Sequence, residues 1–175
     1  GRGSLAGPVT IGIVVLPEDW HIPVTDSKLL SPIQRAELAQ YIHEGALLCE
    51  VMHVEPEFID TEGIVGALRE AGRRVWDLCD PVPDLVLLDG SHNYLGLSVP
   101  VRTIVKGDQV SASIAAASIV AKEARDELMR GHAMMYPEYG FDSHVGYGTV
   151  VHRRAIEKHG PTVLHRKTFL RNILK

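Results

Sequence analysis

Leu85-Val86-Leu87-Leu88-Asp89-Gly90 is the stretch that decides the fold class, because four apolar residues without polar alternation lead directly into an aspartate and a glycine. An unbroken apolar run of this length is typical of a central strand that is buried on both faces, as in α/β proteins. A second strand is predicted over residues 101–105, and it stops at Lys106-Gly107-Asp108. Each strand therefore brings an aspartate to its end, where open α/β sheets commonly assemble their sites.

Further strands and helices are predicted upstream of this stretch. A strand over residues 9–16 precedes a helix that begins with the capping box Ser31-Pro32-Ile33-Gln34 and runs to about His43. A strand over residues 46–54 comes next, and Asp60 or Thr61 can cap another helix. The apolar stripe expected on that helix consists of Ile64, Val65, Leu68, Ala71, Val75 and Leu78.

The last third of the chain is predicted to be mainly helical. A helix over about residues 110–135 has a small, apolar first half, which we expect in the core, and a charged second half, which we expect in solvent. Thr149 can cap a short basic helix that ends at Gly160. Strands mixed with helices around one core predict an α/β fold, and 175 residues suit a single domain.

Charge is distributed unevenly along the chain. Residues 1–121 hold 8 Lys and Arg against 16 Asp and Glu, whereas residues 122–175 hold 10 against 6. This asymmetry suits a carboxylate metal site beside a surface that binds a polyanion, although a basic helix can equally be a solvated face. No apolar run is long enough to span a bilayer, and no signal peptide is recognisable. Because Cys49 and Cys79 have neither metal-ligand nor disulfide spacing, we expect a protein of the reducing cytoplasm.

Asp89 and Asp108 are the candidate catalytic residues. Two carboxylates held on rigid backbone at strand ends can bind a cation that prefers oxygen ligands, such as Mg²⁺ or Mn²⁺. Asp-Gly and Gly-Asp pairs are also ordinary turn sequences. The two aspartates alone therefore leave both interpretations open.

Short motifs in a fixed order carry a resemblance to a known family. They are Gly1-Arg2-Gly3 with Ala6-Gly7-Pro8, Asp26-Ser27-Lys28, Leu88-Asp89-Gly90, Lys106-Gly107-Asp108, the segment 113–122, Arg125-Asp126, Tyr139-Gly140-Phe141, His144 with Gly146-Tyr147-Gly148-Thr149 and His152, and His165-Arg166 with Phe169. Through these motifs the sequence resembles bacterial-type ribonuclease HII along nearly its whole length.

The resemblance implies a ribonuclease H-like fold, in which a mixed central sheet is flanked by helices. It implies one domain, with a catalytic core over about residues 1–135 and a helical substrate-binding segment over about 136–175. The implied reaction is two-metal hydrolysis, with Mg²⁺ or Mn²⁺, of the phosphodiester 5′ of a ribonucleotide, which leaves a 3′-hydroxyl and a 5′-phosphate. The substrates would be RNA/DNA hybrids and single ribonucleotides embedded in duplex DNA.

Four carboxylates build the site in this family, and Asp89 and Asp108 correspond to two of them. The other two are an Asp-Glu pair just upstream of the Gly-Arg-Gly loop, on a strand that is central to the sheet. The sequence begins at Gly1 and so does not contain that pair. We therefore expect the chain as given to cleave poorly, whether an upstream segment has been trimmed or the chain is an inactive fragment.

The same resemblance indicates the substrate-binding residues. Gly1-Arg2-Gly3 matches a loop whose backbone approaches the 2′-hydroxyl, and glycines permit such an approach. Tyr147 matches a tyrosine that stacks on the sugar beyond the ribonucleotide, although a tyrosine between two glycines can also be a packing residue. Lys28 matches a phosphate-binding lysine, although a loop lysine is ordinarily solvated, and Ser27 and Lys106 are further candidates. On charge alone, we expect the backbone of the duplex to be bound by Arg153, Arg154 and Lys158.

Other chemistries find little support in the residues. The histidines have no cysteine partner or His-x-x-x-His pair, so a zinc site is not indicated, and no nucleophile elbow is present. The expected partner is an RNA/DNA hybrid or a duplex DNA that contains ribonucleotides. We expect the protein to act as a monomer and not to associate with a membrane. Two other functions stay open: a non-catalytic module that binds hybrids, and another ribonuclease H-fold nuclease that needs a longer RNA tract.

Overall fold

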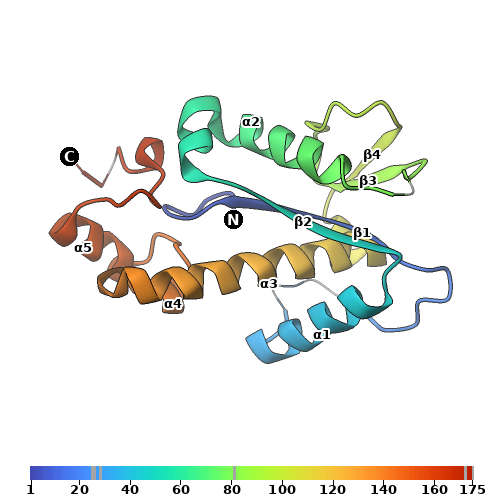
Figure 1. The fold of residues 1–175 in the computed structure, drawn as a ribbon, viewed down its shortest axis with the longest axis horizontal. Coiled ribbons are helices and arrows are strands. Elements are labelled where there is room, and N and C mark those ends of the chain that lie inside the picture. The colour runs from blue at the N-terminus through green and yellow to red at the C-terminus, as the bar shows by residue number, and fades with distance from the viewer. Residues whose placement is uncertain (25–26, 28, 81, 172, 175) are drawn as a thin grey trace.

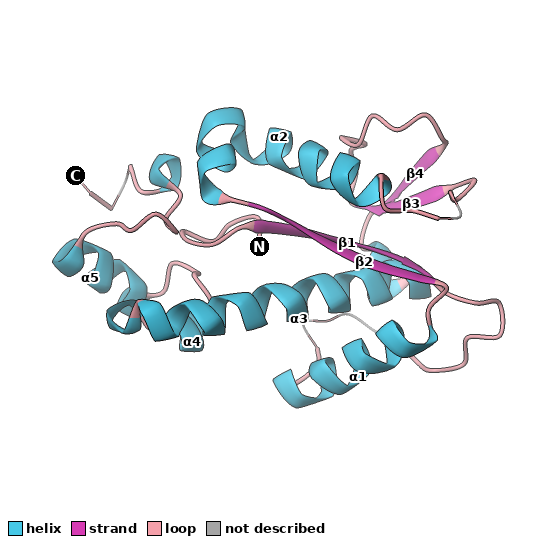
Figure 2. Cartoon of the chain, in the orientation of Figure 1, coloured by secondary structure: helices cyan, strands magenta, loops and turns pink. Residues whose placement is uncertain are grey.

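The structure is a computed structural model that describes residues 1–24, 27, 29–80, 82–171 and 173–174. The elements follow one another as β1 (Val9–Val15), α1 (Pro32–Gly45), β2 (Leu48–Val54), α2 (Pro56–Trp76), β3 (Val86–Asp89), β4 (Val101–Ile104), η1 (Gly107–Gln109), α3 (Ala112–Met135), η2 (Pro137–Tyr139), α4 (Phe141–His144), α5 (Val150–His159) and η3 (Lys167–Phe169). Figure 2 shows this mixture of strands and helices, which confirms the α/β class. No helix in the described ranges is long and apolar enough to cross a membrane.

The strands pair in two separate couples within the described residues. β1 and β2 are antiparallel, with Val9 opposite Val54, and β3 and β4 are parallel, with Asp89 opposite Ile104. Both pairing modes of a mixed sheet are thus present, but no ladder joins the couples in the part of the chain that the structure describes.

The expectation that residues 85–88 form a strand buried on both faces was wrong. Leu85 is 50% exposed and Leu87 is 36% exposed, whereas Leu88 is buried. The physical reason is that β3 pairs with β4 on one side only, and its other side borders an open groove.

Helices cover both faces of the β1–β2 ribbon. In Figure 1, α2 lies on one side of this ribbon, and α3 with α1 lies on the other. The α2 side is filled by Val9, Val54, Ile59, Ala67, Leu68 and Ala71. The other side is filled by Val14, Ala39, Ile42, Ala116, Ile119 and Val120. Removing these apolar side chains from water is the main force that holds the layers together.

Two helices begin as their caps predict. Ser31 makes the complete capping box with Gln34 at the start of α1. The Thr149 side chain accepts the backbone N–H of His152 at the start of α5, and Gly160 caps its end. These short-range hydrogen bonds satisfy backbone groups that have no partner inside the helix.

The start of α2 differs from the prediction. The helix begins at Pro56 and is interrupted at Gly63, whose φ of 72° is not helical. Asp60 therefore lies inside the first segment and does not cap it. Its carboxylate instead accepts the backbone N–H groups of Lys167 and Thr168, at 2.8 and 2.9 Å, and so ties α2 to η3.

The apolar stripe of α2 was only partly correct. Leu68, Ala71 and Val75 are buried, but Val65 is 54% exposed and Leu78 is 48% exposed. Val65 lies just after the interruption, and Leu78 lies beyond the last helical residue. Both residues therefore fall at the margins of the face that packs on the sheet.

The second half of α3 is not solvated as expected. Arg125, Asp126 and Met129 are all buried, at 1%, 3% and 0% exposure. The segment that follows α3 returns along it, and residues 5–6 complete the same core around Met129. This core consists of Leu5, Ala6, Met129, Tyr139, Phe141, Ala155, Ile156, Leu164 and Leu170.

Candidate functional site

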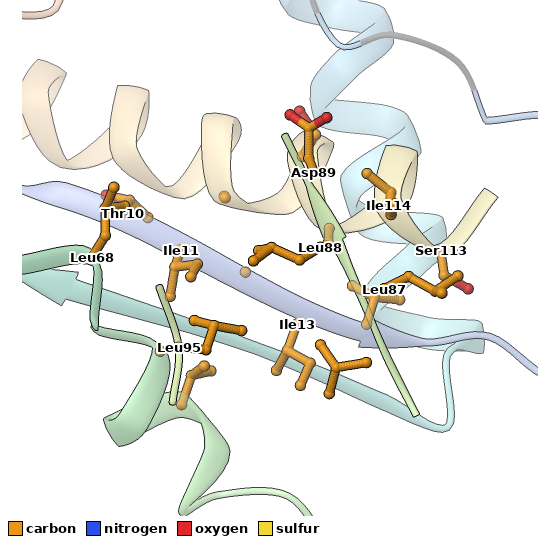
Figure 3. Close-up of a pocket in the computed structure, with 18 of the residues that line it drawn as sticks. Thr10, Ile11, Ile13, Leu68, Leu87, Leu88, Asp89, Leu95, Ser113 and Ile114 are labelled. Carbon is orange, nitrogen blue, oxygen red and sulfur yellow. The ribbon is translucent and has the colours of Figure 1, made fainter. Parts of the chain in front are cut away.

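A cavity of about 880 Å³ lies between the two strand couples. Its walls come from β1 residues 10–15 and from residues 85–89, with parts of α2 and α3 closing it. Figure 3 shows apolar side chains such as Ile13 and Leu87 facing this space, while the Asp89 carboxylate stands at the end of its strand. Gly1, Arg2 and Tyr147 also line the cavity, so three of the predicted site segments border one space.

The two candidate aspartates lie on neighbouring turns. Asp89 is the last residue of β3, and its Oδ1 accepts the backbone N–H of Gly107 at 2.9 Å. Asp108 follows directly in η1, so this hydrogen bond joins the first aspartate to the residue before the second. Asp89 is exposed, whereas Asp108 is 6% exposed and borders a second cavity of about 400 Å³.

Two non-glycine residues in the described ranges have a positive φ, and both precede candidate site segments. Lys106, at φ 55°, comes directly before Gly107-Asp108. Val145, at φ 44°, comes directly before Gly146-Tyr147. Left-handed backbone is costly for such residues and gathers at functional sites, where the surrounding structure holds it in place.

A buried arginine holds the backbone of the glycine loop. Arg166 is 0% exposed and donates hydrogen bonds to the carbonyl oxygens of Gly1, Arg2, Gly7 and Pro8, over 2.7–3.0 Å. Burial, followed by the nearby charge of Arg125, lowers the pKa of Arg166 to about 10. The guanidinium therefore stays charged at neutral pH, with neutral carbonyl groups as its acceptors.

Arg125 joins the glycine loop to the segment that carries Tyr147. Its guanidinium donates to the carbonyls of Pro8 and Ala6 at 3.0 and 2.9 Å, and to that of Val145 at 2.9 Å. The same group lies 5.6 Å from the centre of the Tyr147 ring, which is within the range of a cation–π contact. Burial lowers the pKa of Arg125, and the nearby Tyr147 and Asp126 offset part of this effect.

The backbone at Gly146 makes a direct contact between these two segments. Its carbonyl accepts the N–H groups of Leu5 and Ala6, at 2.9 and 3.2 Å. Gly146 has a φ of 86°, and a Cβ at this position would lie 2.4 Å from the Ala6 carbonyl oxygen. Glycine is therefore required both by the turn and by the close approach.

The remaining predicted residues are placed less centrally. Arg2 is exposed and donates to the Tyr94 hydroxyl at 3.2 Å, while Gly3 is exposed. The Ser27 hydroxyl is buried and lies 3.1 Å from that of Ser118. Lys28 lies outside the described residues, so its predicted phosphate contact stays a prediction.

The donor groups present suit a hard cation. Within the described ranges, no group of three or more His, Cys, Asp or Glu side chains is arranged to hold a metal ion. Asp89 and Asp108 offer only carboxylate oxygens, which are the ligands that Mg²⁺ and Mn²⁺ prefer. They fit such an ion as part of a larger ligand set.

Three residues of the site were missed as functional candidates. Arg125 and Arg166 appeared in the matching motifs, but nothing in their local pattern indicated that they are buried under the glycine loop. Tyr94 follows β3 in an irregular segment, and it belongs here because it lines the cavity and contacts Arg2. All three depend on contacts between distant parts of the sequence.

Proteins of one known family match the chain over nearly its whole length. The model of the family described as Ribonuclease HII matches residues 1–172. The chain belongs to the ribonuclease HII family. Ribonuclease HII of Clostridioides difficile (strain 630) is 47% identical over 175 residues, which cover 99% of this chain and 68% of that protein. Ribonuclease HII of Chlamydia muridarum is 47% identical over 171 residues, which cover 97% and 78%.

Solved structures agree with the ribonuclease H-like fold. The chain is similar to ribonuclease H2 from Pyrococcus horikoshii with a TM-score of 0.78, 24% identity and coverage of 99% of this chain and 93% of the other. It is similar to RNase HII of Archaeoglobus fulgidus, seen in complex with PCNA, with a TM-score of 0.80, 24% identity and coverage of 100% and 93%. As a member of the ribonuclease HII family, the chain is a ribonuclease of a class that acts on RNA/DNA substrates with divalent metal ions.

Proposed function

We propose that the chain provides the core of an endonuclease that hydrolyses the phosphodiester on the 5′ side of a ribonucleotide, in RNA/DNA hybrids and at single ribonucleotides in duplex DNA. The products are a 3′-hydroxyl and a 5′-phosphate. One observation carries the proposal: Asp89, the loop residues Gly1 and Arg2, and Tyr147 line the same cavity. A cation-binding carboxylate, a loop that can approach a ribose and a ring that can stack on a sugar thus border one space.

Ribose selection is assigned to the glycine loop and Tyr147. The 2′-hydroxyl is the group by which a protein distinguishes RNA from DNA. A Cβ at Gly3 would meet nothing within 4 Å, so the loop is open to a ligand there. Tyr147 is 37% exposed, and Arg125 lies over its ring, so part of the residue is accessible to a sugar. A ring packed against the neighbouring sugar favours deoxyribose, which selects the junction between RNA and DNA.

Asp89 and Asp108 are assigned to hold Mg²⁺ or Mn²⁺. When bound, such ions activate water and neutralise charge on the scissile phosphate. The role of the two aspartates is to fix oxygen ligands at adjacent turns, and the Gly107 N–H orients one oxygen of Asp89. Two carboxylates supply half of the negative charge that the family site uses, so the complete site needs further acidic ligands.

The groove between β1 and β3 is proposed to accept a strand that carries the Asp-Glu pair. In the described part of the chain, no ladder joins the facing edges of these strands, and unpaired edges readily accept another strand. The groove walls include Ile11, Ile13 and Leu87, which suit apolar side chains of such a strand. Gly1 lines the same cavity, so residues joined directly to it would lie within reach of the Asp89 end.

The exposed basic side chains of α5 are assigned to the duplex backbone. Arg153, Arg154 and Lys158 are exposed on this helix, and the Arg153 Nε donates to the Gly148 carbonyl at 3.0 Å. The basic surface therefore begins next to Tyr147. Raising the salt concentration is expected to weaken binding steeply, because phosphate contacts release counterions.

Cleavage of a duplex with one embedded ribonucleotide tests the proposal. The experiment uses a chain that also carries the upstream Asp-Glu pair, with Mg²⁺ or Mn²⁺ and mapping of both product ends. We expect one cut 5′ of the ribonucleotide, abolished by Asp89→Asn or Asp108→Asn and retained in Asp142→Asn, which changes an exposed acid on α4. Binding without any product would identify a hybrid-binding module instead. Cleavage only within a longer RNA tract would identify the other type of ribonuclease H.

A further inference from the structure

Three buried histidines surround the segment that carries Tyr147. The His152 Nδ1 lies 2.9 Å from the Tyr147 carbonyl oxygen, which also accepts a backbone N–H from Thr149 at 2.8 Å. The His152 Nε2 lies 3.1 Å from the Nε2 of His165. His144 stacks on His152 with ring centres 4.5 Å apart. His152 and His165 are 0% and 1% exposed, so water does not replace these contacts.

The hydrogen-bond partners of His152 and His165 are compatible with only one placement of the ring protons. A carbonyl oxygen only accepts, so His152 donates from Nδ1 and, when neutral, has a bare Nε2. His165 must then donate from Nε2, and its Nδ1 accepts the backbone N–H of Thr162 at 2.9 Å. Each of these two rings therefore uses one donor and one acceptor, as only a neutral imidazole can.

His144 follows the same rule on the other side of Tyr147. Its Nε2 donates to the Tyr139 carbonyl at 2.7 Å, and its Nδ1 accepts the backbone N–H of Gly146 at 3.3 Å. Two histidines thus bind the backbone on either side of the Tyr147 Cα. The ring stack between them fixes their relative position.

An added proton disturbs this arrangement at His152, where it would occupy Nε2 and face the N–H of His165 across 3.1 Å. On His165 it would occupy Nδ1 and face the N–H of Thr162, with the Thr162 hydroxyl 3.0 Å away as the other contact. Two donors directed at each other repel. Burial, more than any other cause, lowers the pKa of both His152 and His165 to about 4, in agreement with this geometry.

Among the described residues, only backbone hydrogen bonds favour a positive charge on these rings. Those of Tyr147 and Gly146 raise the pKa of His152, and that of Thr162 raises the pKa of His165, each less than burial lowers it. Within the described residues, the hydrogen bonds and ring contacts of the cluster include no carboxylate. Other titratable groups in contact with these residues are Tyr139 from η2, which packs on His165, and Tyr147, which has Arg125 behind its ring. His159, at the end of α5, contacts Tyr139.

We propose that His152 is a positioning residue for Tyr147, that His165 holds it in the one neutral tautomer that can bind the Tyr147 backbone, and that His144 fixes the ring by stacking on it. The inference rests on the proposed function, because Tyr147 is the ring assigned to the deoxyribose at the junction. The cluster would thus set the preference for a ribonucleotide without touching the substrate. A proton added to His152 sets two N–H groups against each other between His152 and His165, which displaces the ring that holds Tyr147 and lowers that preference.

Selectivity measurements test the role in substrate choice. The readout is the affinity for a duplex with one ribonucleotide divided by the affinity for an all-DNA duplex, measured with Ca²⁺ to prevent cleavage. We expect His152→Leu to lower this ratio roughly fivefold, as for the loss of one buried hydrogen bond. His152→Asn, whose amide can still donate to the Tyr147 carbonyl, should keep most of the wild-type selectivity. Its selectivity should also change less than that of the wild type when the pH is lowered. His159→Asn, an exposed position on the same helix, leaves the selectivity unchanged.

A second measurement tests the protonation states of His152 and His165 without any substrate. In the wild-type chain, long-range ¹H–¹⁵N correlation spectra at about pH 6 should find His152 protonated at Nδ1 and His165 at Nε2, both neutral. A proton on His152 Nε2, or titration of either ring near its reference value of about 6.5, would overturn the inference. So would a folded His152→Leu variant with unchanged selectivity. A wild-type chain with the expected tautomers but no preference for the ribonucleotide would refute the proposed function instead.

Discussion

Replacing Arg166 with Met tests whether the buried guanidinium orders the glycine loop. Met keeps an unbranched apolar stem but removes four hydrogen bonds to backbone carbonyls. Hydrogen bonds to a charged group contribute about 1.5–3 kcal/mol each, so four amount to roughly 6–12 kcal/mol. Removing a buried charge also removes its desolvation cost, which is several kcal/mol. The expected net loss in the free energy of unfolding is about 3–5 kcal/mol.

Urea unfolding followed by circular dichroism measures this loss, and Arg35→Met is the matched control. Arg35 is also buried, but its two carboxylate partners have other cations, Arg130 and Lys122. We therefore expect Arg35→Met to cost only about 1–2 kcal/mol, because each carboxylate keeps a cation. A loss below about 1 kcal/mol for Arg166→Met, or a loss no larger than the control, would refute the reasoning.

Two further predictions concern backbone contact and acid sensitivity. Gly146→Ala places a Cβ 2.4 Å from the Ala6 carbonyl oxygen at a positive φ and should lower the free energy of unfolding by roughly 2–4 kcal/mol. Gly131→Ala, in α3 with open space around its Cβ, should raise the free energy of unfolding by up to about 1 kcal/mol. Thermal unfolding measures both variants, and a change of the same sign in the two would contradict this prediction. His152 and His165 have folded pKa values of about 4, below those of the unfolded chain, so protons bind the unfolded chain first as the pH falls. The contribution of these histidines to the free energy of unfolding is therefore complete above about pH 6.5 and is lost as the pH falls towards about 4. Each histidine lowers the free energy of unfolding by up to about 1.4 kcal/mol per pH unit in this range. Urea titrations across this range check the slope, and a flat profile contradicts the assignment.

The parts of the fold that short-range chemistry determines could be predicted from the sequence. The apolar run that stops at Asp89-Gly90 is a local signal, and the structure places Asp89 at the strand end. The caps Ser31 and Thr149 act within three residues of themselves, which is why the starts of α1 and α5 were predicted correctly. Asp60 looked like another cap, but its partners lie more than a hundred residues away, where no local pattern can indicate them.

The parts of the site that depend on distant contacts could not be predicted in this way. Arg125 lies in a charged stretch that resembles a solvated helix face, yet it is buried because the loop near Ala6 and Pro8 surrounds its guanidinium. β3 has one open side because it pairs with β4 alone among the described residues, and an apolar run in the sequence does not specify which strands will lie beside it. The family motifs located Tyr147, but only coordinates reveal the three histidines that hold it.

Binding of Mn²⁺ tests most directly whether Asp89 and Asp108 act together on a cation beside the glycine loop. Electron paramagnetic resonance can follow Mn²⁺ added to a chain that also carries the upstream Asp-Glu pair, with a bound duplex that contains one ribonucleotide, whose phosphate oxygens add further ligands. We predict bound Mn²⁺ in the wild-type chain and in Asp142→Asn, and its loss in both Asp89→Asn and Asp108→Asn. Undiminished Mn²⁺ binding in either of the last two variants would contradict the assignment of these aspartates as partners in one metal site.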